Sequence, residues 1–206
     1  MSNLGFNIYL IFTISWFLHL GTRFPILGLI RFDLLLVSLL FFLSFQKQDD
    51  DNIIKKSQTD KLIKILVIYS VLTIPFVEWP GSVISTGIES LIKAIVFYYF
   101  TISFVQTEEK LKKFIHIFIG CQLFRIVEPL YLHITEGYWG SMASMANWEY
   151  LNRLSGAPSD IVNPNGLAFI VCTALPFLYG LSTLGLVNRL AFVIFSPICI
   201  YVLILT

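Results

Sequence analysis

Residues 161–188 contain no charged side chain, and residues 1–22 contain none either. Each stretch is long enough to cross a bilayer as a helix, which takes about 20 mostly apolar residues. In lipid the backbone polar groups must satisfy one another, and a helix does this within one segment. The composition agrees, since 56% of the 206 residues are hydrophobic and 13% are charged, whereas soluble domains carry about 25% charged residues. The sequence therefore predicts an all-α fold, a polytopic transmembrane helix bundle.

The apolar runs predict about seven spans in a single transmembrane domain that covers residues 1–206. The first run lacks the basic start and small-residue cleavage site of a signal peptide, so it is expected to be retained. The second run is short and is expected to use an apolar segment just before it. The predicted spans are 5–20, 34–45 with 26–30, 62–78, 82–105, 111–133, 161–188 and 190–206.

Basic side chains concentrate in alternate loops between these runs. One side of the membrane would hold most of the 14 Lys and Arg residues: Lys47, Lys55, Lys56, Lys61, Lys64, Lys110, Lys112, Lys113 and Arg189. The loops of the other side hold Arg23, Arg31 and Arg153. Because cytoplasmic loops are enriched in Lys and Arg, the N-terminus is predicted to be cytoplasmic and the loop 134–160 external. The net charge of +1 provides no basic field, so no nucleic-acid partner is expected.

Two pairs of ionisable residues fall well inside the predicted spans 82–105 and 111–133: Glu89 with Lys93, and Arg125 with Glu128. A charge at the centre of a membrane helix costs at least about 2.5–3.5 kcal/mol on insertion scales, so such residues pair, line a wet cavity or serve a function. Their i,i+4 and i,i+3 spacings put each pair on one helix face. A deep lysine without a carboxylate tends to lose its proton. We therefore expect one of the two glutamates close to the lysine.

These charges allow two interpretations. They could form a structural ion-pair cluster that holds two neighbouring helices together. Alternatively, they could line a polar cavity open to the outside, in which Lys93 and Arg125 bind an anionic ligand and the two glutamates orient them. The second interpretation needs further positive charge, which Arg31 and Arg153 would supply from the same side of the membrane.

The external loop is rich in aromatic side chains. Residues 141–151 predict a helix that lies flat at the membrane interface. Trp148 and Tyr150 have two interpretations of nearly equal weight. They could anchor the segment at the interface, or they could offer aromatic faces to the sugars of a lipid-linked substrate.

Arg153 comes shortly before the pattern Asn163-Pro164-Asn165. An asparagine cap followed by proline is typical of a helix start, where free backbone N–H groups favour anions. A guanidinium group suits phosphate because its donors form a rigid fork. We expect Arg153, Asn163 and Asn165 to bind an anion, and the alternative is that the two asparagines merely cap the helix.

The cysteines and histidines show no pattern of a site. They are scattered, without CxxC pairing or metal-ligand spacing. We expect no disulfide framework and no metal, and packed or interfacial side chains for Cys121, Cys172, Cys199, His19, His116 and His133.

The segment after the external loop resembles the O-antigen ligase and polymerase superfamily of bacterial envelope polysaccharide enzymes. The specific part of the likeness is Arg153-x-Ser155-Gly156, a short spacer, and Asn163-Pro164-Asn165-Gly166-Leu167-Ala168 opening a helix. Less specific flanking features are Arg31-x-Asp33, the turn from Pro75 to Glu78, the loop that begins at Thr107, and Pro176.

This resemblance implies an enzyme of the bacterial cytoplasmic membrane. The family transfers a glycan from an undecaprenyl-diphosphate carrier to a lipid, protein or glycan acceptor at the outer face, without a cofactor. Arg153 matches an outward arginine thought to hold the pyrophosphate, which makes it the first candidate for a catalytic role. The family histidine thought to activate the acceptor lies later in the chain, and His19, His116 and His133 do not match it. The chain is therefore expected to be the N-terminal part of a longer protein.

Two other functions fit the same features. A carrier or flippase for a lipid-linked oligosaccharide would show the same cations but no group that activates an acceptor. A non-catalytic membrane scaffold would keep the charges within the spans paired and its outer loop free of ligand.

Overall fold

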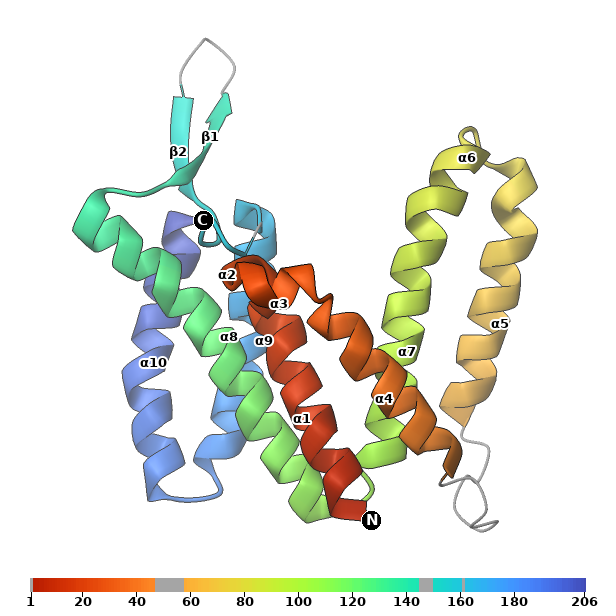
Figure 1. Ribbon diagram of the computed structural model, residues 1–206. Coiled ribbons are helices and arrows are strands. Elements are labelled where there is room, and N and C mark those ends of the chain that lie inside the picture. The colour runs from red at the N-terminus through yellow and green to blue at the C-terminus, as the bar shows by residue number, and fades with distance from the viewer. Residues whose placement is uncertain (1, 47–57, 145–149, 161) are drawn as a thin grey trace.

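The computed structural model describes residues 2–46, 58–144, 150–160 and 162–206, and this described part of the protein is mostly helical. The mostly helical fold is thereby confirmed (Figure 1). By length and composition, four helical segments of the described chain could each cross a membrane: Pro80–Phe104, Glu108–Glu136, Pro164–Ser182 and Leu186–Leu205.

The N-terminal half contains the shorter helices. They are α1 (Ser2–Leu18), α2 (Leu20–Arg23), α3 (Pro25–Leu29), α4 (Phe32–Gln46), α5 (Gln58–Thr73), the 3-10 turn η1 (Ile74–Phe76), α6 (Pro80–Ser82), the π-helical turn η2 (Val83–Gly87) and α7 (Ile88–Phe104). Prolines at the starts of η1 and α6 suit those positions because a first-turn N–H has no partner within the helix. The apolar stretches of α1 and α4, Asn3–Leu18 and Phe32–Phe45, are shorter than the four longer segments.

One apolar core joins α1, α4 and α7. Tyr9 at its centre has no exposed surface, and its hydroxyl lies 2.7 Å from the Thr101 hydroxyl oxygen on α7. Gly5 allows the close approach of α1 to α7, because a Cβ atom there would lie 2.8 Å from the Phe104 ring. The buried members of this core are Phe6, Tyr9, Phe12, Leu36, Leu40, Phe100 and Phe104.

A second core joins the three long C-terminal helices, α8 (Glu108–Glu136), α9 (Pro164–Ser182) and α10 (Leu186–Leu205). Leu167 and Val171 of α9 and Val202 of α10 have no exposed surface. Helix α8 begins at a Thr107 cap, whose side chain accepts from the Lys110 N–H, and ends at Gly137 in the left-handed conformation.

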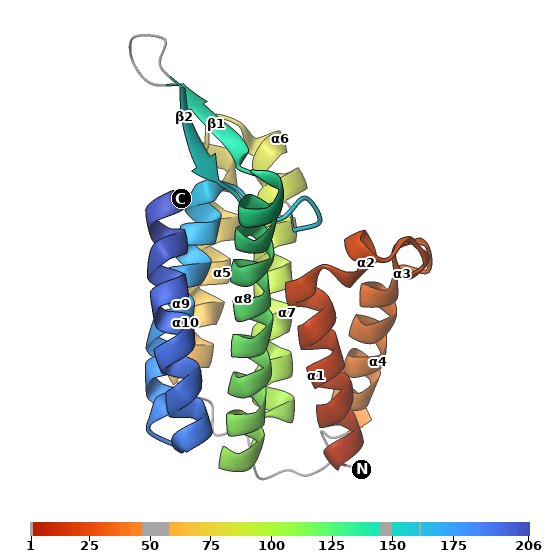
Figure 2. The same ribbon diagram turned by 90° about the vertical axis from the view of Figure 1, so that its left-hand side faces the viewer.

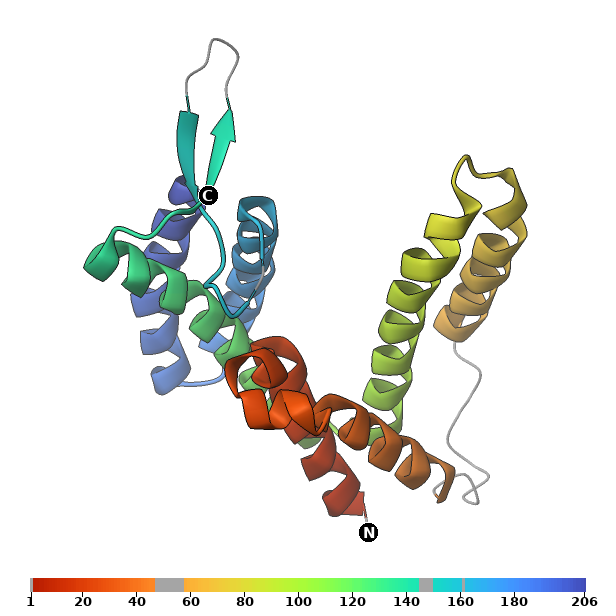
Figure 3. The ribbon, with the colours of Figure 1, turned by 45° about the horizontal axis from the view of Figure 1, so that its top comes forward.

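Helices α5 and α7 lie side by side and lean away from α8, α9 and α10 (Figure 3). The Tyr98 hydroxyl on α7 donates to Oδ1 of Asp60 on α5 at 3.0 Å, and Asp60 is buried. The two ends of the bundle differ. The N-terminal end holds the starts of α1, α5, α8 and α10, whereas α6, a β-hairpin and the chain's C-terminus lie at what we call the hairpin end (Figure 2).

The segment predicted to be external contains two paired strands, so the predicted helix over residues 141–151 is wrong. Strands β1 (Gly140–Ser144) and β2 (Tyr150–Leu154) pair antiparallel, with Gly140 opposite Leu154 and Ser144 opposite Tyr150. Gly140 has φ 79°, and a Cβ atom there would lie on the Ser155 hydroxyl, so only glycine fits this corner. Burial of Leu154 in the second core anchors the register.

Replacing Leu178 by Ala should destabilise the second core, because Leu178 is 2% exposed and its loss leaves a cavity between α9 and its neighbours. The expected cost is about 2–5 kcal/mol. Thermal unfolding of the detergent-solubilised protein measures it. Leu190→Ala on α10 is the matched control, since Leu190 is 54% exposed and should cost under about 0.5 kcal/mol. Equal losses for both variants would contradict this packing.

Candidate functional site

A buried ion pair joins α8 to the loop before α9. Nε of Arg125 donates to both carboxylate oxygens of Asp160, at 2.8 Å to Oδ2 and 3.1 Å to Oδ1. The Arg125 side chain is 9% exposed and that of Asp160 has no exposed surface. Nη1 of Arg125 also donates to Oε1 of Gln122, one helical turn away, at 3.3 Å. The guanidinium group is therefore held from two directions.

His19 completes this cluster from the junction of α1 and α2. Its Nδ1 lies 2.8 Å from Oδ1 of Asp160, and its side chain is 44% exposed. The residue has φ 50° and ψ 50°, which is the left-handed region. Few residues other than glycine adopt this conformation, although histidine does so more readily than most. It lets the chain turn sharply after α1, where the imidazole meets the loop before α9.

The electrostatic surroundings keep Asp160 ionised. Burial by itself would raise the pKa of this carboxyl. The hydrogen bonds from His19 and Arg125, together with the positive charge of Arg125, outweigh burial and hold the pKa of Asp160 below its ordinary value. The carboxylate is thus a fixed negative charge to which α1, α8 and the loop are all connected.

A second ion pair lies between α2 and α8. The two terminal nitrogens of Arg23 each donate to one oxygen of Glu128 at 2.5 Å, a fork-to-fork arrangement. Nε of Arg23 donates to the Leu18 carbonyl oxygen at 2.6 Å, and the guanidinium lies 5.0 Å from the centre of the Phe124 ring. The hydrogen bonds that Arg23 donates to Glu128 raise the pKa of Arg23 above its already high value.

Arg153 lies at the base of the hairpin, beside the start of α9. Its Nη2 donates to Oδ1 of Asn165 at 2.8 Å, and its Nε donates to the main-chain oxygen of Thr206, next to the end of α10. Oδ1 of Asn163 accepts from the Gly166 N–H at 2.7 Å and caps α9. Within the part of the chain that the structure describes, no Asp or Glu side chain pairs with Arg153. This is the difference between Arg153 and the carboxylate-paired Arg23 and Arg125.

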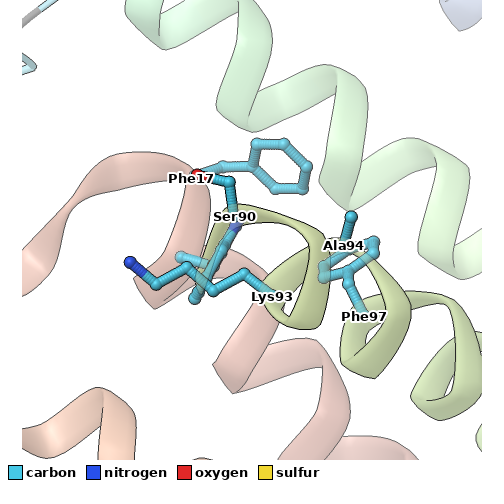
Figure 4. Close-up of a pocket in the computed structure, with 6 residues that line it drawn as sticks. Phe17, Ser90, Lys93, Ala94 and Phe97 are labelled. Carbon is cyan, nitrogen blue, oxygen red and sulfur yellow. The ribbon is translucent and has the colours of Figure 1, made fainter. Parts of the chain in front are cut away.

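Lys93 lies on the exposed face of α7 and is not part of the cluster that Arg125, Asp160 and His19 form. It lines a pocket of about 460 Å³ with Trp16 and Phe17 of α1 and with Ser90, Ala94 and Phe97 of its own helix. In Figure 4 its ammonium group extends away from Phe97. Glu128, one of the two glutamates expected near Lys93, forms its ion pair with Arg23.

The other candidate residues are dispersed. Arg31 is exposed beside the start of α4 and has φ 49°. Glu89 lies in α7 and Tyr150 in β2, but their side chains are outside the described part of the structure. Trp148 lies outside the described residues altogether.

The structure therefore brings Arg125 and Glu128 into separate ion pairs whose partners the sequence analysis did not anticipate. The sequence offers one reason to expect Asp160 as a partner of an arginine, because it is the only acidic residue between Arg153 and Thr206. No feature of the sequence identifies His19 or Arg23 as a site residue, since each is a single polar residue at the end of an apolar run. Among the described residues, no group of three or more His, Cys, Asp or Glu side chains could hold a metal ion.

Comparison of the chain with protein-family models, curated proteins and solved structures finds no significant match.

Replacing Arg125 by Met should destabilise the protein by about 3–5 kcal/mol, because it leaves a buried carboxylate without its strongest partner. Thermal unfolding in detergent measures the change. Arg189→Met is the control, since Arg189 is exposed in the first turn of α10. Adding Asp160→Leu to Arg125→Met should recover much of the loss, as an apolar pair often replaces a buried ion pair at little cost. A single variant as stable as the wild type would contradict the pairing.

Because the pKa of Asp160 is lowered in the native protein, the stability of the fold should decrease at acidic pH. The unfolded chain protonates this carboxyl near pH 3.9, whereas the native protein keeps it ionised to lower pH. The stability it provides is fully present above about pH 4 and is lost as the pH falls through the lowered native pKa. Unfolding followed at several acidic pH values should therefore show a steeper loss for the wild type than for Asp160→Asn. Parallel curves below about pH 4 would exclude this contribution.

Proposed function

We propose that this chain spans a bacterial cytoplasmic membrane about seven times and handles an undecaprenyl-diphosphate-linked glycan at the outer face. In this proposal it belongs to a glycosyl-transferring ligase or polymerase of the O-antigen type. The glycan passes to a lipid, protein or glycan acceptor. The observation that carries the proposal is the position of Arg153, which lies against the capped start of α9 without an acidic side chain as partner among the described residues.

The distribution of basic residues supports the orientation. Among the described residues, most Lys and Arg side chains outside the middle of a helix belong to the starts of α5, α8 and α10, at the N-terminal end of the bundle: Lys61, Lys64, Lys110, Lys112, Lys113 and Arg189. The positive-inside rule then puts the N-terminal end in the cytoplasm. The hairpin end, with Arg153 and α9's first turn, faces outward.

Arg153 has the chemistry that a departing diphosphate needs. When the glycan leaves its carrier, negative charge develops on the diphosphate oxygen, and a preorganised guanidinium group stabilises it. Asn165 and the main-chain oxygen of Thr206 fix the plane of this group in advance. Asn163 sets the first turn of α9, whose N-terminal N–H groups favour an anion at the same place. Lys93 and Arg31 would act on other parts of the lipid, since neither lies in this cluster.

A non-catalytic scaffold is the second candidate, and the ion pairs are the observation that favours it. Arg125 is paired with Asp160 and Arg23 with Glu128, so these two guanidinium groups are already matched by carboxylates. A scaffold would use them to hold α1, α2 and α8 together. In that case Arg153 would serve only to attach the hairpin to α9 and α10.

Binding of undecaprenyl diphosphate by the full chain in nanodiscs separates the two candidates. Arg153→Ala should weaken binding by about 10–100-fold, since a hydrogen bond to a charged group is worth about 1.5–3 kcal/mol. The matched control is Arg189→Ala, which removes an exposed arginine from the N-terminal end and should bind as the wild type does. Undecaprenol, which lacks the diphosphate, should bind both proteins equally.

In the bacterium that encodes the chain, Arg153→Ala should abolish the transferred glycan while the protein is still made in normal amount. Undiminished glycan in that strain, or no preference of the wild type for the diphosphate over undecaprenol, would remove the enzyme proposal and leave the scaffold.

A further inference from the structure

A pocket of about 500 Å³ lies where the starts of α1 and α8 meet, at the N-terminal end of the bundle (Figure 1). Ligand pockets in proteins have volumes of about 300–1,000 Å³. The hairpin with Arg153 lies at the opposite end, so the proposed function does not use this pocket. Most of the side chains that line it are polar: Asn3, Asn7, Thr107, Glu109, Lys110 and Lys113.

The charged side chains of the pocket favour an anion. Lys110 and Lys113 provide two positive charges and Glu109 one negative charge, which leaves one positive charge in excess. The neighbouring Lys112 forms an ion pair with Glu108 at 2.7 Å, so these two residues add no net charge. A ligand with one negative charge, such as a phosphodiester, would balance the pocket.

The pocket also offers hydrogen-bond donors that suit phosphate oxygens. Asn3 and Asn7 are one helical turn apart on α1, so their amides share a face of the helix. In the described part of the chain, neither side-chain amide is engaged in a hydrogen bond. The Lys110 ammonium lies 5.4 Å from the centre of the Phe6 ring, and this cation–π contact keeps it at the pocket.

The length of α8 places the pocket at the depth of lipid headgroups. A helix of 29 residues is about 43 Å long, whereas the hydrocarbon core of a bilayer is about 30 Å thick. When such a helix crosses the membrane, the excess length extends beyond the hydrocarbon. Because charged side chains are costly in hydrocarbon, the first turns of α8, with Lys110 and Lys113, then lie among the headgroups.

Apolar side chains continue from the pocket toward the middle of both helices. Ile11 lies one turn beyond Asn7 on α1 and is 47% exposed. Ile117 lies one turn beyond Lys113 on α8 and is partly exposed. A charged pocket that continues into an exposed apolar surface matches a lipid with a headgroup and acyl chains better than it matches a free phosphate ion.

We propose that this pocket binds the headgroup of a phospholipid with one negative charge, for which phosphatidylglycerol is the model. The phosphodiester lies between Lys113 of α8 and the amides of α1, and the acyl chains extend along Ile11 and Ile117. Basic pockets between membrane helices recognise anionic headgroups in this way. The inference requires α8 to cross a membrane, as in the proposed function, but it does not depend on the transfer of a glycan.

Native mass spectrometry of the full chain in detergent, with phosphatidylglycerol or phosphatidylcholine added, measures the binding. The wild type should bind phosphatidylglycerol about fivefold more tightly than phosphatidylcholine, which is the usual share of one basic residue near an anionic lipid. Lys113→Gln should remove this preference. Glu109→Gln should strengthen phosphatidylglycerol binding by about the same factor, because it removes the carboxylate that lines the pocket.

Arg189→Gln is the matched control. Arg189 is an exposed basic residue at the same end of the bundle, in the first turn of α10, and it does not line the pocket. Its replacement removes the same charge and should leave the lipid preference unchanged. Glycerol 1-phosphate, which has the phosphate but no acyl chains, should not displace the lipid at equal concentration.

Equal binding of the two phospholipids by the wild type, or equal losses for Lys113→Gln and Arg189→Gln, overturns the site. Failure of Glu109→Gln to strengthen binding also overturns it, and a gain in affinity cannot result from a damaged fold. Displacement by glycerol 1-phosphate overturns the choice of a lipid as the ligand. These outcomes leave the role of Arg153 untouched. Conversely, undecaprenyl diphosphate binding that survives Arg153→Ala removes the enzyme proposal and leaves this site intact.

Discussion

A carboxylate removed from water must be matched by positive charge and hydrogen bonds. In this protein the buried carboxylate is that of Asp160, and the fold must bring partners to it. Its side chain has no exposed surface, and it accepts from Arg125 of α8 and His19 at the end of α1. Three segments that are far apart in the sequence meet around this one charge. These hydrogen bonds hold the loop between the hairpin and α9 in place, and they thereby also position the start of α9.

The same constraint connects the two apolar cores. One core lies among α1, α4 and α7, and the other among α8, α9 and α10. Side chains of α1 and α8 touch, as where the rings of Phe17 and Phe118 lie 5.1 Å apart, but ring contacts in a lipid environment do not define a unique register. The ion pair of Arg23 with Glu128 and the cluster around Asp160 do so, because charges in such surroundings tolerate only matched positions. Arg153, at the hairpin end, is instead held by the side-chain amide of Asn165 and the main-chain oxygen of Thr206.

Local patterns predicted several elements well. The Asn163-Pro164 start of α9 lies at the expected residue, since a side-chain cap and a proline act within one turn. The expected run 190–206 corresponds to α10, which begins four residues earlier at Leu186. The structure of the segment 141–151 was predicted incorrectly, because its methionine and tryptophan spacing suits a helix. The pairing of β1 with β2 depends on Gly140 and on the burial of Leu154, which are contacts made outside the segment.

For the site, the sequence identified the charges but not their partners. Arg125, Glu128 and Arg153 stand out because each is an ionisable group in or beside an apolar run, and the cost of that position is a property of the residue alone. That Arg125 faces Asp160, that Glu128 faces Arg23 and that His19 faces Asp160 depend on which helices become neighbours. The sequence by itself determined a helical chain with apolar spans and a few costly charges, because length and hydropathy act locally. Only the tertiary structure decided the pairing, because each partner comes from a segment that the chain places nearby only after its helices have packed.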